Sequence, residues 1–290
     1  MRAVQRYGEK SQNRDVLAKG DEPVNDSKVF IALLLSFMVS ASVVTAEEKA
    51  AAVEGKNATV EAAETEEPLS YGASVQFLSK YVSRGAVVSG DPVLQPEVWL
   101  SYKGFTFDIW NNVDLTDYEI APWRLTESDF TVEYAFSLSK ATIGLGYSYY
   151  TYPNLHYDDT QEFYASACLD VFLSPELTVY YDIDEICGVY ANGLVRYAVP
   201  LGLECKGEKV NAELSAAVGW GDSNYIGGCF DDTGESLVDL LLSCAVPVKL
   251  SDNVSLTPSI SYMTVLDSHL RQCTGKSDAL YGGIAVTVEF

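Results

Sequence analysis

The stretch that decides the fold is Ala279-Leu-Tyr-Gly-Gly-Ile-Ala-Val-Thr-Val-Glu-Phe290, at the end of the chain. Its even-numbered positions carry Leu, Gly, Ile, Val, Val and Phe, whereas its odd-numbered positions after Ala279 carry Tyr, Gly, Ala, Thr and Glu. A strand with this period of two presents one apolar face and one small or polar face. The stretch alone fits a membrane barrel or an amphipathic strand that closes a soluble β-sandwich.

The same alternation recurs along the chain. Most of the segments that show it are longer than the ~5–6 residues usual in soluble sheets, and they are long enough to cross a bilayer at a tilt. They predict an all-β fold, a transmembrane antiparallel up-and-down β-barrel of about 12 strands over residues 69–290. The expected strands are 70–83, 93–102, 105–113, 128–138, 141–151, 161–173, 177–184, 188–203, 210–220, 236–250, 253–265 and 279–290.

The connections between these segments alternate in length. With both termini on the short side, short turns at one end and long loops at the other are typical of an even-stranded outer-membrane barrel. One connection, 185–187, breaks the rule by being short. The expected short turns are 103–104, 139–140, 174–176, 204–209 and 251–252, and the expected long loops are 84–92, 114–127, 152–160, 221–235 and 266–278.

Charges avoid the apolar phase of all twelve segments. A basic residue that faces lipid at the midplane costs about 2–4 kcal/mol, so this exclusion is expected in a membrane. A soluble sandwich would show the same alternation, and strand length, the N-terminal sequence and the terminal Phe favour the barrel. The predicted lumen-lining residues are Glu97, Asp108, Asp129, Glu133, Asp170, Asp182, Glu213, Asp239, Lys80 and Arg196, and Glu162, Asp184, Lys249 and Glu289 share their phase.

The N-terminal region predicts export. Lys28 precedes an apolar run that is too short to span a bilayer comfortably, and Val44 and Ala46 occupy the small-residue cleavage positions. We therefore interpret residues 1–46 as a signal peptide. Residues 1–27 are polar and mixed in charge, which indicates an over-extended start, with the true translation start further downstream. Residues 47–68 are rich in Ala and Glu and contain no aromatic residue, which predicts an acidic disordered periplasmic tether.

The overall charge excludes one class of partner. The formal net charge is −22, and it becomes −23 without residues 1–46, which hold six basic and five acidic residues. Binding to nucleic acid needs a basic patch that neutralises phosphates, so we expect no nucleic-acid partner. The 19 Tyr and 21 Gly fit a barrel whose two faces differ strongly in polarity.

Three short motifs follow one another at the start of the predicted barrel. They are Ser74-Val-Gln-Phe-Leu-Ser-Lys-Tyr-Val-Ser-Arg-Gly85, Pro92-Val-Leu-Gln-Pro-Glu97 and Phe105-Thr-Phe-Asp-Ile-Trp-Asn-Asn112. In this order they resemble the opening strands of the TorF-type family of outer-membrane porins. The final Phe290 resembles the terminal aromatic residue that the barrel-assembly machinery reads in Gram-negative barrels. The resemblance implies a location in the cell outer membrane, with outer-membrane lipid and that machinery as partners.

The lumen of the predicted barrel is narrow, because twelve strands enclose far less space than the sixteen of a large porin. Its inward phase holds eleven acids against three bases, which predicts a porin-like channel that favours small cationic solutes. Large side chains share that phase, and the alternative is a non-conducting barrel with a structural or surface-interaction role. These large residues are Leu78, Trp99, Trp110, Tyr164, Phe172, Tyr180, Tyr190 and Leu194.

Arg84 lies where the first strand meets the first long loop. It would either line a constriction of the channel or anchor its loop by pairing with Asp91 or another acid at a strand end. Among the six cysteines, Cys229 and Cys273 fall in neighbouring long loops and are the candidate disulfide, since export permits oxidation.

No catalytic residues, metal or cofactor are predicted. Both histidines, His156 and His269, fall in long loops, and no G-x-S-x-G element accompanies them. The paired loop acids at 158–159 and 231–232 lack the oxygen spacing of a dedicated calcium loop. We therefore expect a protein that is not an enzyme.

Overall fold

The computed structural model describes residues 69–118 and 120–290. The predicted signal peptide (1–46) and tether (47–68) lie outside these residues and stay predictions.

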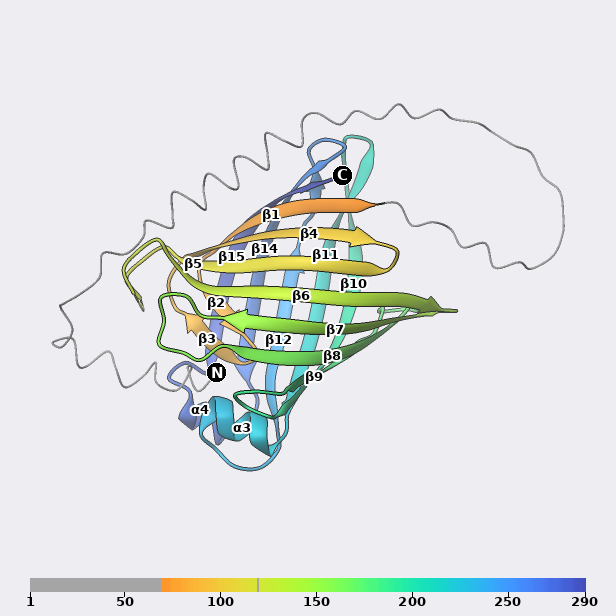
Figure 1. The fold of residues 1–290 in the computed structure, drawn as a ribbon. Helices are drawn as coiled ribbons and strands as arrows, with labels where there is room; N and C mark the ends of the chain where they lie inside the picture. Colours follow the sequence, from red (N-terminus) through yellow and green to blue (C-terminus); the bar gives the residue numbers. More distant parts are fainter. Residues whose placement is uncertain (1–68, 119) are drawn as a thin grey trace. The chain divides into compact units, whose positions relative to one another are not determined.

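The described residues form long antiparallel strands that close into a barrel (Figure 1). Strand bounds agree with the predicted ones to within a few residues at most ends. The barrel strands are β1 (Ser70–Leu78), β4 (Val93–Tyr102), β5 (Phe105–Asp114), β6 (Arg124–Leu138), β7 (Ala141–Thr151), β8 (Thr160–Leu169), β9 (Glu176–Asp182), β10 (Val189–Cys205), β11 (Glu208–Gly221), β12 (Ser236–Ala245) continued by β13 (Val248–Lys249), β14 (Val254–Val265) and β15 (Asp278–Glu289).

Each barrel strand pairs with its neighbours in the sequence, and the ends of the sheet meet. The first and last strands pair from Gly72 opposite Glu289 to Leu78 opposite Gly283. Because β12 and β13 pair with successive parts of β14, they act as one wall strand. The result is a closed up-and-down barrel of 12 strands, which confirms the predicted fold.

The apolar phase of the strands points outward. Phe107, Leu145, Phe163 and Ile260 are each more than half exposed, although a soluble protein buries residues of this kind. In the described part of the chain, the one other sheet is the two-stranded β2–β3 pair, so no second sheet covers this face. The exposed apolar surface therefore rules out the β-sandwich and fits strands in contact with hydrocarbon.

Two-residue turns close several hairpins at the end where the barrel begins and finishes. Lys206 and Gly207, between the paired residues Cys205 and Glu208, have φ of 53° and 81°. Positive φ at both central positions is the type I′ turn, which matches the twist of antiparallel strands. The predicted short turn at this position is confirmed.

The opposite end carries the long connections and two short helices, α3 (Ser223–Phe230) and α4 (Leu270–Cys273). Both fall in segments that we expected to be irregular loops. Neither of these helices, nor any other in the described residues, is long and apolar enough to cross a membrane.

The first predicted strand, 70–83, needs correction. The wall strand β1 stops at Leu78, and a bend at residues 79–80 leads into β2 (Tyr81–Ser83), which pairs with β3 (Ala86–Ser89). These two short strands form a sheet of their own. Figure 1 shows this β2–β3 hairpin (orange) at the same end of the barrel as α3 and α4.

Candidate functional site: a hairpin across the lumen

The β2–β3 hairpin crosses the lumen from one wall to the opposite wall. It starts from β1, and its tip residues Arg84 and Gly85 contact side chains of β8, β9, β10 and β12, which lie three to six strands away by the shorter way around the closed barrel. At its base, the ring of Tyr81 lies 5.6 Å from that of Trp110 on β5. Because the contacts come from distant strands, the hairpin occupies the interior.

The tip of the hairpin is a tight turn. Arg84 (φ 44°) and Gly85 (φ 82°) both have positive φ between the paired residues Ser83 and Ala86. A Cβ added to Gly85 would lie 2.8 Å from a methyl carbon of Val238 on β12. Glycine is therefore required here both by the backbone and by the opposite wall.

Arg84 fixes the tip to that wall. Its guanidinium donates to both carboxylate oxygens of Glu162 on β8, at 2.6 and 2.9 Å. It also lies over the rings of Tyr180 and Tyr190, 4.2 and 5.1 Å from their centroids. The Arg84 side chain is 16% exposed and that of Glu162 5%, so this is a buried ion pair with the fork geometry that arginine favours. Arg84 therefore pairs with Glu162 at the start of β8 and not with Asp91, whereas its role in a channel constriction stays a prediction.

One side of the hairpin is sealed by apolar packing. Val82 and Val87 pack against a buried cluster that joins α3 and α4 to the wall strands β10, β12, β14 and β15. The members of this cluster are Tyr190, Tyr225, Ile226, Cys229, Phe230, Val238, Met263, Val265, Leu270 and Ala279. The alternation of the predicted strand 236–250 places Val238 on its apolar, lipid-facing phase. A register shift between β11 and β12, at Val218/Trp220, turns it inward, and Leu237 is exposed instead.

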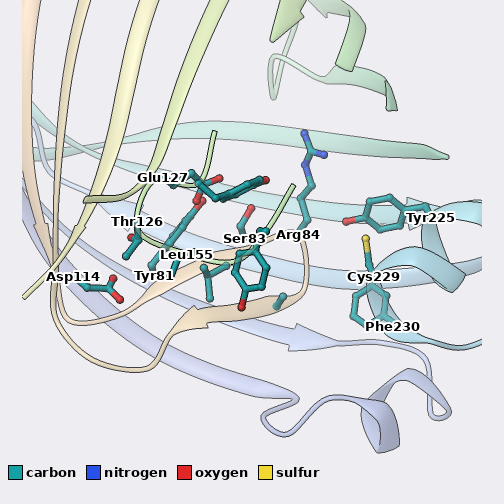
Figure 2. Close-up of a pocket in the computed structure, with 14 residues that line it drawn as sticks. Tyr81, Ser83, Arg84, Asp114, Thr126, Glu127, Leu155, Tyr225, Cys229 and Phe230 are labelled. Atoms are coloured by element: carbon teal, nitrogen blue, oxygen red, sulfur yellow. The ribbon is translucent and has the colours of Figure 1, made fainter. Parts of the chain in front are cut away.

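The other side of the hairpin borders a cavity of about 50 Å³. Figure 2 shows Glu127 and Tyr81 on one side of it and the α3 residues Tyr225, Cys229 and Phe230 on the other. The complete lining is Tyr81, Ser83, Arg84, Ala86, Val88, Asp114, Thr126, Glu127, Tyr152, Leu155, Tyr157, Tyr225, Cys229 and Phe230. Most of these residues were not singled out from the sequence.

The sequence contains a local pattern that predicts the helix α3, which forms one wall of this cavity. The Asp222 side chain accepts a hydrogen bond from the Tyr225 backbone N–H at 2.8 Å, so it caps the helix. Tyr225, Ile226, Cys229 and Phe230 are all buried, and they follow the helical spacing of one, four and five residues. An Asp before such a pattern predicts a helix start, which the assignment of 221–235 as a loop overlooked.

Below the hairpin, four predicted lumen acids remain on the inner wall. Glu97 accepts a hydrogen bond from Ser74 at 2.9 Å, and Glu133 accepts one from the Tyr164 hydroxyl at 2.9 Å. Asp129 has one buried carboxylate oxygen without a hydrogen-bond partner among the described residues. Asp108 completes the group. None of these four carboxylates forms an ion pair with a described residue.

Large inward side chains fit beside glycines of the neighbouring strand. The Trp99 ring occupies the space where a Cβ of Gly72 would lie, and the Tyr164 ring does the same at Gly146. In each pair the aromatic ring lies flat along the wall, over the glycine of the neighbouring strand. The ring therefore requires glycine at that inward position, because any larger side chain would overlap it. Phe172 is an exception, because it is 77% exposed beyond the end of β8 and contacts the Tyr197 ring at 5.9 Å.

The short-turn end of the lumen is wider and carries both signs of charge. A cavity of about 360 Å³ lies there, with Glu213, Lys249, Asp252 and Glu289 in its lining. Lys249 pairs with Glu208 at 2.6 Å. Nearby along the wall, Arg196 pairs with Glu176 at 2.9 Å. The two predicted sites Glu213 and Arg196 therefore lie far along the strands from the hairpin.

Four further residues that the sequence places on the lumen phase have other roles or positions in the structure. They are Asp182, Asp239, Asp170 and Lys80. Asp182 is 2% exposed and accepts from the backbone N–H groups of Asp184, Ile186 and Cys187, so it organises the loop after β9. Asp239 is buried and accepts from the Tyr190 hydroxyl at 3.0 Å.

Two others lie outside the strands. Asp170 follows the end of β8 and is exposed in the turn, because that strand stops at Leu169. Lys80 lies in the bend between β1 and β2 and donates to the carbonyl of Leu280. A phase counted along a predicted strand fails at both positions because the strand has already ended.

The cysteines and histidines add no further site. The structure does not join Cys229 to Cys273: Cys229 is buried in α3, whereas Cys273 is exposed at the end of α4. Burial raises the pKa of the Cys229 thiol to about 12, which disfavours the reactive thiolate. Both His156 and His269 are exposed in loops. No group of His, Cys, Asp or Glu within residues 69–118 and 120–290 is arranged to hold a metal ion.

Comparison with known proteins finds similar solved structures. No model of a known protein family matches the chain, and no curated protein matches it. An outer-membrane channel from Pseudomonas putida F1 is 11% identical with a TM-score of 0.45, over 80% of this chain and 100% of the other.

Two named porins are similar to the same degree. The NanC porin is 12% identical with a TM-score of 0.44, over 75% of this chain and 98% of the other, and the KdgM porin is 11% identical with a TM-score of 0.42, over 76% and 99%. At such identities a likeness assigns neither a solute nor a family, so membership of the TorF-type family stays a prediction.

Proposed function

We propose that the protein is a porin-like channel of the outer membrane that passes small solutes and favours cations. Its narrowest level is the β2–β3 hairpin, and solutes cross this level on the cavity side, since the other side is filled by the apolar cluster. The exposed apolar outer face of the barrel supports a location in a membrane.

The proposal rests on one observation: four acidic side chains of the inner wall have no basic side chain in the described part of the chain that neutralises them. Glu97, Asp108, Asp129 and Glu133 have no ion-pair partner among the described residues, and the hairpin's Arg84 is neutralised by Glu162. Charges of one sign in a narrow passage with low-dielectric walls focus the field and concentrate counter-ions. The passage therefore attracts cations and repels anions.

Recording from the purified barrel in a planar bilayer under a potassium chloride gradient tests the proposal. The expected result is a stable conductance whose reversal potential has the sign of potassium permeation. Replacing Asp108 and Glu133 together, Asp108→Asn with Glu133→Gln, should move the reversal potential toward zero. A reversal potential of chloride sign would contradict the proposed selectivity.

A non-conducting barrel with a structural or surface-interaction role is the second candidate. The apolar cluster that joins the hairpin, α3, α4 and the wall favours it, because this packing already fills much of the lumen at the long-loop end. A wild-type barrel that is folded, inserted and electrically silent would support this candidate over the channel.

The C-terminal strand supports a further partner. The Phe290 ring stacks on that of Tyr71 with centroids 5.4 Å apart, and the two backbones exchange hydrogen bonds where the barrel closes. We infer that the assembly machinery of the outer membrane reads this last strand before closure. Removal of Phe290 should reduce assembly of the barrel in cells, measured by its heat-modifiable migration.

A further inference from the structure

The cavity beside the hairpin combines aromatic walls with carboxylates. Tyr81, Tyr152, Tyr157, Tyr225 and Phe230 supply the rings. The rings of Tyr152 and Tyr157 meet edge to face with centroids 5.9 Å apart. Aromatic faces carry negative charge density and attract cations, organic ones above all.

Two carboxylates line the same cavity. Asp114 is 3% exposed and accepts a hydrogen bond from the Asn112 amide at 3.1 Å. Glu127 lies beside the Tyr81 hydroxyl, as Figure 2 shows. Neither acid forms an ion pair with a residue that the structure describes. Carboxylates away from water are normally paired with a cation, so the missing charge points to a ligand.

Arg84 also lines the cavity, but its positive charge is already neutralised by an ion pair with Glu162. Its guanidinium makes two hydrogen bonds to Glu162, and the Tyr150 hydroxyl donates to the same carboxylate at 2.8 Å. Around the cavity one arginine therefore faces three carboxylates, Asp114, Glu127 and Glu162, which disfavours an anionic ligand.

We propose that this cavity binds the ammonium head of a small organic amine, with Glu127 as its counter-ion and the tyrosine rings around it. The inference rests on the proposed function, since the cavity lies on the route past the hairpin. It deepens that function by naming the class of cation that the narrow level selects.

The size and donor chemistry support an organic head group rather than a bare ion. About 50 Å³ is room for about four water-sized spheres, taking ~12 Å³ for each. That space matches a primary ammonium with one or two carbons. Calcium needs six to eight oxygen ligands, whereas this lining is mostly aromatic and aliphatic.

Calorimetric titration of the folded, full-length barrel in detergent with ethylammonium chloride tests the inference. Tetraethylammonium chloride serves as a probe too large for the cavity, and potassium chloride supplies the constant background. The wild type should bind ethylammonium saturably and tetraethylammonium not at all. Glu127→Gln should weaken ethylammonium binding by about tenfold or more, because a hydrogen-bonded charge pair is lost.

Glu213→Gln is the matched control. It removes an inward acid of β11 that lines the cavity at the short-turn end and lies outside the cavity beside the hairpin, so it should change binding by less than about twofold. Tyr152→Leu provides a second test that keeps both acids, and it should also weaken binding. If Glu127→Gln does not fold, Tyr152→Leu decides the question alone.

Several results would overturn the inference. Equal binding by Glu127→Gln and wild type, an equal loss of binding in the control variant and in the cavity variants, or saturable tetraethylammonium binding would each place the amine elsewhere. Cation-selective conductance without ethylammonium binding overturns this inference and leaves the channel standing. Binding by a barrel that never conducts supports the site and overturns the channel.

Discussion

Two hairpins in this protein have turns of the same sequence pattern and backbone geometry, but one lies inside the barrel and the other is exposed to water. Arg84-Gly85 and Lys206-Gly207 are each a basic residue followed by glycine, with φ of 44° and 82° in the first turn and 53° and 81° in the second. Lys206 and Gly207 are exposed at the short-turn end, and a Cβ at Gly207 would meet nothing within 4 Å. Arg84-Gly85 lies inside the barrel against β8 and β12.

The difference shows what a local pattern decides. Both turns place two residues of positive φ between paired strands, the second of them glycine, and this is the type I′ geometry. Whether that turn lies in water or crosses a lumen depends on partners that are distant in sequence. For Arg84 the partner is Glu162, 78 residues away, with Tyr180 and Tyr190 beside it. Comparing the two turns by mutation separates local from tertiary contributions.

The largest difference is expected from removing the basic side chain of each turn. Arg84→Ala leaves Glu162 buried without its counter-charge, so it should lower the free energy of unfolding by roughly 3–5 kcal/mol. Lys206→Ala should leave that free energy nearly unchanged, because the side chain is in water. Urea titration of the barrel in detergent micelles, followed by tryptophan fluorescence, measures both. Equal effects would show that Arg84 does not hold the hairpin.

An intermediate difference is expected at the two glycines. Gly207→Ala should cost about 1–2 kcal/mol, since the added methyl group strains a backbone with positive φ. Gly85→Ala should cost roughly 2–4 kcal/mol, because the same strain is joined by overlap with Val238. The same titration checks the pair. If both substitutions cost the same, the tip is not pressed against β12 as described.

The smallest effect is expected from a change that keeps the charge. Arg84→Lys retains a cation beside Glu162 but loses one of the two parallel hydrogen bonds and the planar contact with Tyr180. The cost should be about 1.5 kcal/mol. A loss as large as that of Arg84→Ala would mean that shape rather than charge fixes the tip, and the ion-pair account of the comparison would need revision.

The barrel itself could be predicted because its signal is repeated and physical. Alternation alone places Phe107 and Leu145 on the apolar phase of the predicted strands 105–113 and 141–151, and both are more than half exposed on the outer face. Errors occur where a strand ends early or changes register. Asp170 lies beyond the end of β8, and the shift near Val218 moves Val238 from the outer face into the buried cluster.

The site was predicted less completely, for a physical reason. Tyr81 and Ser83 continue the alternation of the first strand, so the bend at 79–80 that takes them off the wall has no periodic signature. Glu127 lies within a predicted long loop, where acids are normally solvated. Cavity residues come together from β2, β3, β5, β6, the loop after β7 and α3, and sequence alone does not show which of these meet.

The measurement that tests the central claim most directly is the conductance of a barrel without its hairpin. Residues 81–89 are replaced by a short Gly-Ser linker, and single channels of this variant and the wild type are recorded side by side under a potassium chloride gradient. The account predicts a severalfold larger conductance that still prefers cations, because the acids of the inner wall remain. An unchanged conductance, or a change to chloride selectivity, would contradict a cation passage narrowed by this hairpin.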